Sequence, residues 1–251
     1  MPYRRLTLAT LVPLAAASVL ANGFVLGRFI LSGERAYGFL IWNLFLAWVP
    51  IGCALIAQGL AFSLLSPRRP MRVRLQLVSL AAFSLGWLVF FPNAPYLMTD
   101  LVHLRPFQEN SLLWFDTAMF ATFALLGVAL GCLSLLAMQD VVATGCHRVF
   151  RRVRGARPVA RFLAAASGWV FAIATLGAGS YGMYLGRVMR WNSWDALFNV
   201  DDVALSIARS LIDRPSAPGM FKITAVFGLF LVCAYVTMYA FTRVRPTVDT
   251  N

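Results

Sequence analysis

Asp100 and His103 are the residues of this chain whose types and spacing most directly suggest chemistry. They stand three positions apart in the segment FFPNAPYLMTDLVHL, so a helix there would place both on one face. A carboxylate and an imidazole can act as acid and base near neutral pH. Together with Asp116, they are the candidate catalytic residues. The alternative is a kinked helix end at a membrane interface, in which Asp100 is a solvated cap.

A metal site is a weaker interpretation of the same residues. An Asp-x-x-His pair is a poor metal signal, because a metal site takes three or four ligands. Asp116 and Asp195 could add carboxylates, although nothing in their spacing requires it. The four cysteines have no metal-ligand spacing. We therefore predict no metal site, and the residues identify no cofactor.

A second polar segment, YGMYLGRVMRWNSWD, contains two arginines beside an amide and a carboxylate. A guanidinium group binds phosphate or carboxylate through a fork of N–H donors. Arg187 and Trp191 are four residues apart and could stack as a cation on an aromatic face. The partner of the arginines is either an internal carboxylate, Asp100 or Asp116, or an anionic ligand. Both interpretations stay open.

Asn43 and Asn93 belong to the same predicted polar region. Pro92 and Pro95 cannot continue a regular helix, and Asn93 is placed to pair with a backbone carbonyl that they leave free. The predicted ligand-binding residues share a polar side chain near a span end that lies on one side of the membrane. They are Asn43, Asn93, Arg187, Arg190, Asn192 and Asp195.

Composition indicates what kind of element positions these residues. The chain has 251 residues, of which 60% are hydrophobic and 13% charged, and its mean hydropathy is +0.72. An average soluble domain has about 25% charged residues. These values exclude a disordered chain, a fibrous repeat and an ordinary cytosolic enzyme. An integral membrane protein remains.

Six apolar stretches are long enough, or nearly so, to cross a bilayer core of roughly 30 Å as helices. We predict an all-α bundle that forms one membrane domain over residues 1–251. The predicted spans are residues 6–27, 36–65, 75–91, 117–138, 162–186 and 223–242. An amphipathic helix over residues 199–212 is expected to lie on the outer surface above the polar site, as a structural strap or as a lid.

The direction of the spans follows from the distribution of arginine. The whole net charge of +12 falls on the side that holds both termini. This pattern predicts a cell (inner) membrane protein with both termini in the cytoplasm, and basic loops that contact membrane lipids rather than nucleic acid. The small residues Val19-Leu20-Ala21 leave open whether the first span is a cleaved signal peptide or an uncleaved anchor.

Four motifs in order, WNLFLAWVP, FFPNAPYLMTDLVHL, WFD and YLGRVMRWNSWD, resemble the bacterial membrane-protein family known as domain of unknown function thirteen sixty-one. The resemblance covers roughly residues 39–241. It implies a multi-pass membrane protein and no specific activity. By motif, the family's distinctive residues here are Trp42, Asn43, Pro92, Asn93, Pro95, Tyr96, Asp100, His103, Trp114, Asp116, Tyr184, Arg187, Arg190, Asn192, Ser193, Trp194 and Asp195.

Three classes of function fit these observations. The first is a protein whose polar site at the extracytoplasmic interface binds or processes an anionic lipid headgroup or a lipid-linked substrate. The second is a non-catalytic component that packs with a partner protein or a second copy, through the small residues Ala174, Ala178, Gly182 and Gly186. The third is a small-solute transporter, which the lack of charge at mid-membrane depth disfavours. The residues leave open whether the protein is an enzyme.

Overall fold

The protein is a bundle of long helices. The computed structural model describes residues 7–33, 35–64, 70–104, 112–154, 157–212 and 217–243, which contain no strand. The helices are α1 (Leu8–Ser32), α2 (Phe39–Ser63), α3 (Pro70–Phe90), α4 (Asn93–Tyr96), the 3-10 helix η1 (Leu97–His103), α5 (Leu113–Arg154), α6 (Arg157–Arg187), α7 (Asp195–Phe198), α8 (Val200–Ile212) and α9 (Ala217–Arg243).

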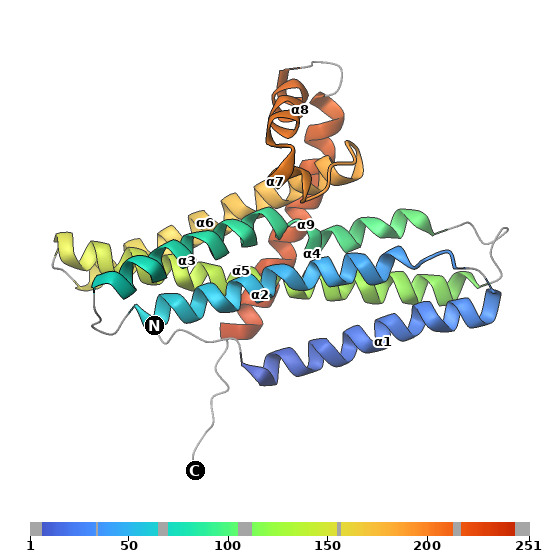
Figure 1. The fold of residues 1–251 in the computed structure, drawn as a ribbon, viewed down its shortest axis with the longest axis horizontal. Helices are drawn as coiled ribbons and strands as arrows, with labels where there is room; N and C mark the ends of the chain where they lie inside the picture. Colours follow the sequence, from blue (N-terminus) through green and yellow to red (C-terminus); the bar gives the residue numbers. More distant parts are fainter. Residues whose placement is uncertain are drawn as a thin grey trace, which may run out of the picture.

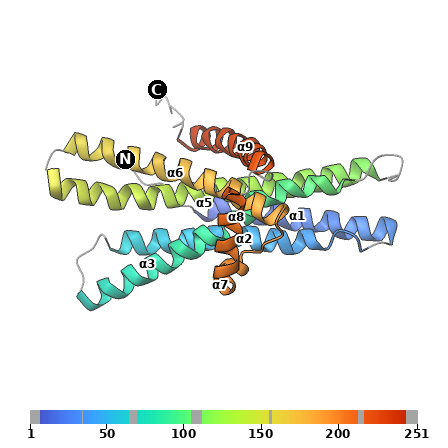
Figure 2. The same cartoon turned by 90° about the horizontal axis from the view of Figure 1, so that it is seen from above.

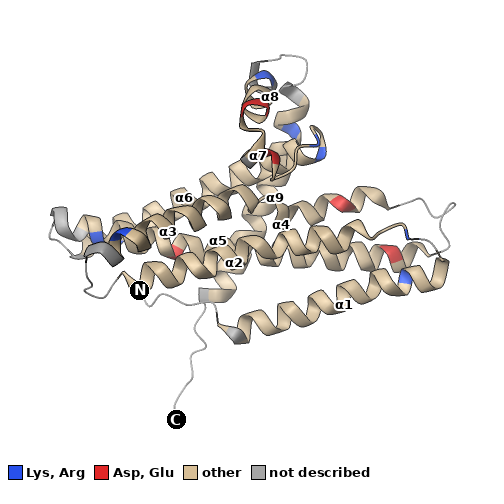
Figure 3. Cartoon of the chain, viewed as in Figure 1, with Lys and Arg blue, Asp and Glu red and all other residues tan. Residues whose placement is uncertain are grey.

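Six helical segments in the described part of the chain are long and apolar enough to cross a membrane. They correspond to α1, α2, α3 continued through η1, α5, α6 and α9. The predicted all-α, multi-pass membrane fold is therefore confirmed. Figure 3 shows that most of the ribbon along the middle of the long helices carries no charged residue, as the high cost of a charge in hydrocarbon requires.

α5 is the central helix of the bundle. It packs against α1, α2, α6 and α9, while α2 also packs against α3. Figures 1 and 2 show α1, α2, α3, α5 and α6 running side by side along the long axis of the molecule. In Figure 1, α9 crosses this set at a steep angle, and it lies against α6. The core is apolar and includes Phe120, Phe123 and Leu130 of α5, each fully buried.

α5 continues far beyond the fourth predicted span. The prediction ended that span at Met138, because Asp140 and several arginines follow. The helix instead runs unbroken to Arg154, since no proline interrupts the sequence there. Asp140 is only 8% exposed, and the Tyr235 hydroxyl of α9 donates a hydrogen bond to Gln139. This end of the bundle therefore has a polar core where the sequence suggested a loop.

The helix of the third predicted span, residues 75–91, ends just before Pro92. α3 ends at Phe90, and the chain resumes as α4 and then as η1. Asn93 donates a hydrogen bond through Nδ2 to the backbone carbonyl of Phe90 at 3.1 Å, which is the role predicted for it. The broken segment satisfies a freed carbonyl within the protein, as a membrane interior requires.

Glycines on two helices make room for this broken segment. A Cβ atom on Gly127 of α5 would clash with the backbone oxygen of Ala94, and one on Gly182 of α6 would lie 2.7 Å from the Pro92 side chain. A Cβ on Gly186 would lie 3.1 Å from the Tyr96 ring. The absence of these side chains thus fixes how close α4 and η1 lie to α5 and α6.

The small-residue stripe predicted as a packing seam divides into two parts. Gly182 and Gly186 contact α4 within the same chain, as described above, whereas Ala174 and Ala178 are exposed. Some of the basic residues of the predicted cytoplasmic loops, together with both chain termini, lie outside the described residues.

Candidate functional site

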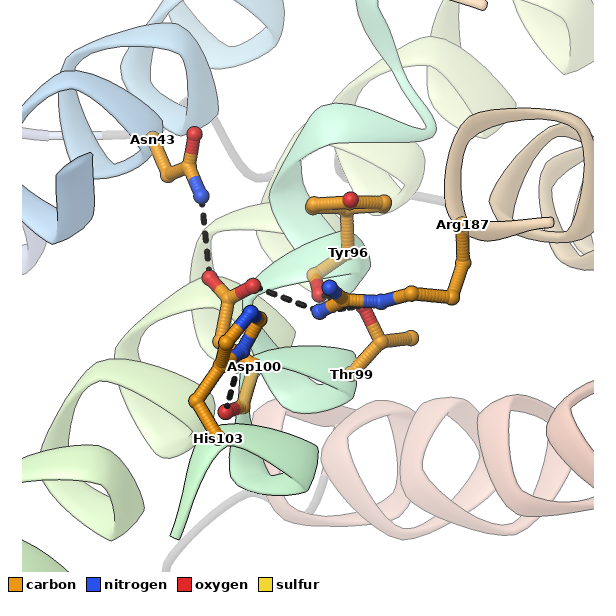
Figure 4. Close-up of polar contacts among 6 residues, drawn as sticks. All are labelled: Asn43, Tyr96, Thr99, Asp100, His103 and Arg187. Carbon is orange, nitrogen blue, oxygen red and sulfur yellow. Dashed lines mark hydrogen bonds and ion pairs between the residues drawn. The ribbon is translucent and has the colours of Figure 1, made fainter. Parts of the chain in front are cut away.

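A buried ion pair joins the two polar segments that the sequence singled out. Arg187 Nη2 at the end of α6 lies 2.6 Å from Asp100 Oδ1 in η1. The second carboxylate oxygen, Oδ2, accepts a hydrogen bond from Asn43 Nδ2 of α2 at 2.9 Å. Figure 4 shows these three side chains converging from three helices. Asp100 is 1% exposed, so it is not a solvated cap.

Arg187 is held on several sides, and one of its nitrogens has no partner in the described part of the chain. Its Nε and Nη2 atoms donate to the Thr99 hydroxyl at 3.1 and 2.9 Å. Its guanidinium carbon lies 4.9 Å from the centre of the Tyr96 ring, a cation–π contact visible in Figure 4. The remaining nitrogen, Nη1, makes no hydrogen bond with any described residue. The guanidinium is thus pre-oriented, with donors left for a ligand.

The predicted stack of Arg187 on Trp191 is replaced by this contact with Tyr96. The reason is that α6 ends at Arg187, so Trp191 no longer follows one helical turn later. The chain leaves the helix through Arg190, whose φ of 61° lies in the left-handed region.

His103 is oriented by the backbone of its own helical turn. Its Nδ1 atom lies 3.2 Å from the carbonyl oxygen of Asp100. A carbonyl oxygen can only accept, so this contact is a hydrogen bond only when Nδ1 carries a proton. The ring also packs on Phe39, with centroids 5.1 Å apart. The position of the His103 ring is therefore set by one backbone contact and one aromatic contact.

These residues line one cavity of about 420 Å³ between α2, α4, η1, α6 and α8. Such a volume lies within the range of roughly 300–1,000 Å³ that is usual for small-molecule sites. The lining residues combine aromatic, apolar and polar side chains, and they are Phe39, Trp42, Asn43, Leu46, Val89, Pro92, Asn93, Tyr96, Asp100, His103, Gly182, Leu185, Gly186, Arg187, Trp191, Asn192, Ser193, Ala196, Val203 and Ile207.

Asn93 and Asn192 also take part in this cavity. Besides its bond to the backbone, Asn93 Nδ2 donates to the Ser193 hydroxyl at 2.7 Å, which ties α4 to the segment after α6. Asn192 is exposed, and its side chain makes no hydrogen bond with any described residue. Four of the six predicted ligand-binding residues therefore line the cavity. They are Asn43, Asn93, Arg187 and Asn192.

Arg190 and Asp195 do not line the cavity. Arg190 is exposed and makes no ion pair with a described residue. Asp195 accepts hydrogen bonds from the backbone N–H of Asn192 at 2.8 Å and from Asn199 Nδ2 at 2.9 Å. It thereby organises the turn that leads to α7 and α8.

Asp116 lies in a separate ion pair, and the cavity does not include it. Its Oδ1 atom is 2.6 Å from Arg28 Nε of α1, and the Tyr37 hydroxyl donates to its Oδ2 at 3.2 Å. The structure therefore brings Asp100, His103 and Arg187 together and leaves Asp116 between α1 and α5.

Several residues that line the cavity or hold its residues in place were absent from the predicted site. Thr99, Tyr96 and Ser193 hold the predicted residues in place, and Val203 and Ile207 of α8 form part of the wall. Tyr96 and Ser193 stand in the motifs quoted for the family, which was the available signal. The apolar stripe of residues 199–212 was a second signal, because it needed a surface to pack on.

The described residues contain no group of three or more His, Cys, Asp or Glu side chains that could hold a metal ion. The available chemistry is instead that of an oriented guanidinium, an imidazole and several amides beside aromatic rings. Such a set can bind an anionic oxygen and neighbouring hydrogen-bonding groups.

Comparison with protein families gives one match. The family described as "Protein of unknown function (DUF1361)" matches residues 42–238. This range begins in α2 and ends in α9, so it contains every residue that lines the cavity except Phe39. No curated protein and no solved structure matches the chain.

Proposed function

This chain belongs to the DUF1361 family, and from the geometry of its cavity we propose that it binds the phosphate-bearing headgroup of a lipid or lipid-linked molecule. The observation that carries the proposal is the state of Arg187. Its guanidinium is fixed in the cavity wall by Thr99, Asp100 and Tyr96, yet its Nη1 nitrogen has no partner among the described residues. Arginine N–H groups bind phosphate oxygens strongly.

The surroundings of the cavity support a ligand with an apolar portion. Leu46, Val89 and Leu185 line it beside the polar groups, and all three belong to helices long and apolar enough to cross a membrane. A lipid-linked molecule has the matching chemistry, since its headgroup is polar and its chains are apolar.

The proposal also includes the side of the membrane. The cavity lies at the end of the bundle opposite the arginine-rich loops, and the positive-inside rule assigns those loops to the cytoplasm. We therefore propose an extracytoplasmic site in the inner membrane, with both termini cytoplasmic.

Two further observations favour binding over the other predicted classes. The lining residues of α2 all precede Val49 and those of α6 all follow Ser180, so the cavity occupies one end of the described bundle. A transporter needs a path to the other face. The glycines of the small-residue stripe are covered by Pro92 and Tyr96, which leaves only its alanines for a partner protein.

The test compares lipid binding by matched variants in detergent solution. Native mass spectrometry would measure retention of phosphatidic acid against diacylglycerol, which lacks the phosphate. The double variant Asp100→Asn/Arg187→Gln removes both charges together, so it leaves no unpaired buried carboxylate. A hydrogen bond to a charged group contributes about 1.5–3 kcal/mol, so we expect roughly ten- to hundredfold weaker retention of phosphatidic acid.

Two controls complete the experiment. Arg190→Gln makes the same change three residues later, outside the cavity, and should retain phosphatidic acid like the unmodified protein. Ala196→Phe fills the cavity, whereas Ala204→Phe adds the same ring at an exposed position of α8. Only the first should reduce retention. Equal retention of phosphatidic acid and diacylglycerol by the unmodified protein would reject the proposal.

A further inference from the structure

We infer that the phosphate-bearing headgroup is a polyol or a sugar, and that the cavity recognises its hydroxyl groups through neutral amides and aromatic rings. This inference rests on the proposed function, because it specifies what is attached to the phosphate. It follows from the charge balance of the cavity, from the atoms left without partners, and from the aromatic residues in its wall.

The charge balance excludes a headgroup with a second strong charge. Asp100 and Arg187 neutralise each other, and among the described residues no other Asp, Glu, Lys or Arg lines the cavity. Both oxygens of Asp100 are engaged, one by Arg187 and one by Asn43. In the described part of the chain, a cationic group such as an ammonium would therefore meet no free carboxylate, and a second phosphate would meet no second arginine.

The atoms left free are mostly neutral acceptors. Asn43 uses its amide nitrogen on Asp100, and Asn93 uses its amide nitrogen on Phe90 and Ser193. The oxygens of both amides make no hydrogen bond with a described residue. Asn192 adds an amide whose donors and acceptor make no hydrogen bond with a described residue. Hydroxyl groups donate and accept at once, so several hydroxyls on one ring or chain match this set.

Aromatic rings complete the wall. Phe39, Trp42, Tyr96 and Trp191 all line the cavity. The face of an aromatic ring is electron-rich and attracts the slightly positive C–H groups of a packed ligand. A polyol or sugar ring has apolar C–H faces and a hydroxyl edge, so it can use aromatic and amide groups in the same site.

The experiment ranks phospholipids that share the phosphate but differ in what it carries. Purified protein in detergent would be titrated with phosphatidylinositol, phosphatidylglycerol, phosphatidic acid and phosphatidylethanolamine, and bound lipid measured by native mass spectrometry. We expect phosphatidylinositol to bind roughly five- to tenfold more tightly than phosphatidic acid, because each neutral hydrogen bond changes affinity by about two- to tenfold. Phosphatidylethanolamine should bind most weakly.

A variant separates hydroxyl recognition from phosphate binding. Asn192→Ala removes an exposed amide that no described residue uses, so it should reduce the affinity for phosphatidylinositol by about two- to tenfold and leave that for phosphatidic acid unchanged. Asn22→Ala is the matched control, because Asn22 lies in α1 outside the cavity and its Oδ1 atom has no partner among the described residues.

The outcomes distinguish this inference from the proposed function. Phosphatidic acid binding as tightly as phosphatidylinositol, while still requiring Arg187, would overturn the polyol inference and support the phosphate site. If the Asp100→Asn/Arg187→Gln variant retains phosphatidic acid as well as the unmodified protein, the proposed function itself is overturned. Binding of soluble inositol 1-phosphate tests whether the ligand is a lipid headgroup or a free solute. If it binds as tightly as phosphatidylinositol, the chemistry is supported and a free solute replaces the lipid.

Discussion

Two arginine–carboxylate pairs of equal length have opposite surroundings in this protein. Arg28–Asp116 and Arg187–Asp100 both have an N–O distance of 2.6 Å, and an aromatic ring lies near each guanidinium. The side chain of Arg28 is 10% exposed and that of Asp116 is fully buried, whereas Arg187 is 26% exposed. The first pair is sealed between α1 and α5. The second lines a cavity of about 420 Å³.

The free nitrogen of each guanidinium makes the difference concrete. Nη1 of Arg28 has no partner among the described residues and is buried, so a ligand cannot reach it. Nη1 of Arg187 also has no partner in the part of the chain that the structure describes, but it belongs to a residue of the cavity wall. Function is therefore expected at the pair whose surroundings leave space. The sealed pair is expected to stabilise the fold and do no more.

The largest expected effect comes from breaking the sealed pair. Arg28→Met leaves Asp116 buried without its cation, which typically costs about 3–5 kcal/mol. We expect a large fall in the thermal unfolding temperature of the detergent-solubilised protein, measured by differential scanning fluorimetry. Arg35→Met, at an exposed arginine near the same end, should change stability by no more than about 0.5 kcal/mol. Equal stability of both variants would contradict a structural role for the sealed pair.

A somewhat smaller effect is expected from moving the cavity without touching its charges. Gly127→Ala forces the new Cβ atom against the backbone oxygen of Ala94, and such overpacking costs about 1–3 kcal/mol. Because α4 leads directly into η1, retention of phosphatidic acid should fall as well. Gly145→Ala in the same helix meets nothing within 4 Å and should stabilise slightly. Unchanged lipid retention by Gly127→Ala would show that lipid binding does not depend on the position of α4.

A still smaller effect is expected when both members of the sealed pair are replaced together. Arg28→Met/Asp116→Leu removes both charges of the sealed pair, and exchange of a whole ion pair for apolar residues is often neutral or stabilising. The double variant should recover most of the stability lost in Arg28→Met and should retain phosphatidic acid. The corresponding change at Asp100 and Arg187 should preserve the fold and weaken retention of phosphatidic acid roughly ten- to hundredfold. A sealed-pair double variant that loses the lipid would show that the two pairs share one function.

No change in stability is expected from the variant that tests the proposed orientation. Arg190→Cys, in a background without the four native cysteines, places an exposed thiol beside the cavity. A membrane-impermeant maleimide should label it in intact cells. Labelling only after lysis would place the cavity at the cytoplasmic face and overturn the proposed topology.

The fold could be predicted from the sequence because the bilayer imposes a length and a polarity on each span. The C-terminal end of α5 could not be predicted, because Gln139 and Asp140 are polar residues of the kind found in loops and a neighbouring helix covers them only in the folded protein. Tyr235, which contacts Gln139, is 96 positions away. Tertiary partners of this kind leave no trace in local hydropathy.

The candidate site was predicted in part, and for the same reason. Asp100 was one of the two internal partners that the sequence left open for Arg187, because both lie at one predicted end. The sequence could not choose between Asp100 and Asp116, since that choice depends on which helices are neighbours. α1 lies against α5 and brings Arg28 to Asp116, so Asp116 is already paired.

The length of α5 means that this helix extends beyond the hydrocarbon layer of a membrane. At 42 residues and about 1.5 Å per residue the helix is about 63 Å long, roughly twice the thickness of a hydrocarbon layer. Its packed core continues as far as Thr144, which is 9% exposed. A single helix is thus in contact with both lipid and water. Lipid surrounds one part of α5. Where α5 extends beyond the hydrocarbon layer, the hydrophobic effect of water drives the burial of its apolar face, as in any soluble helical bundle.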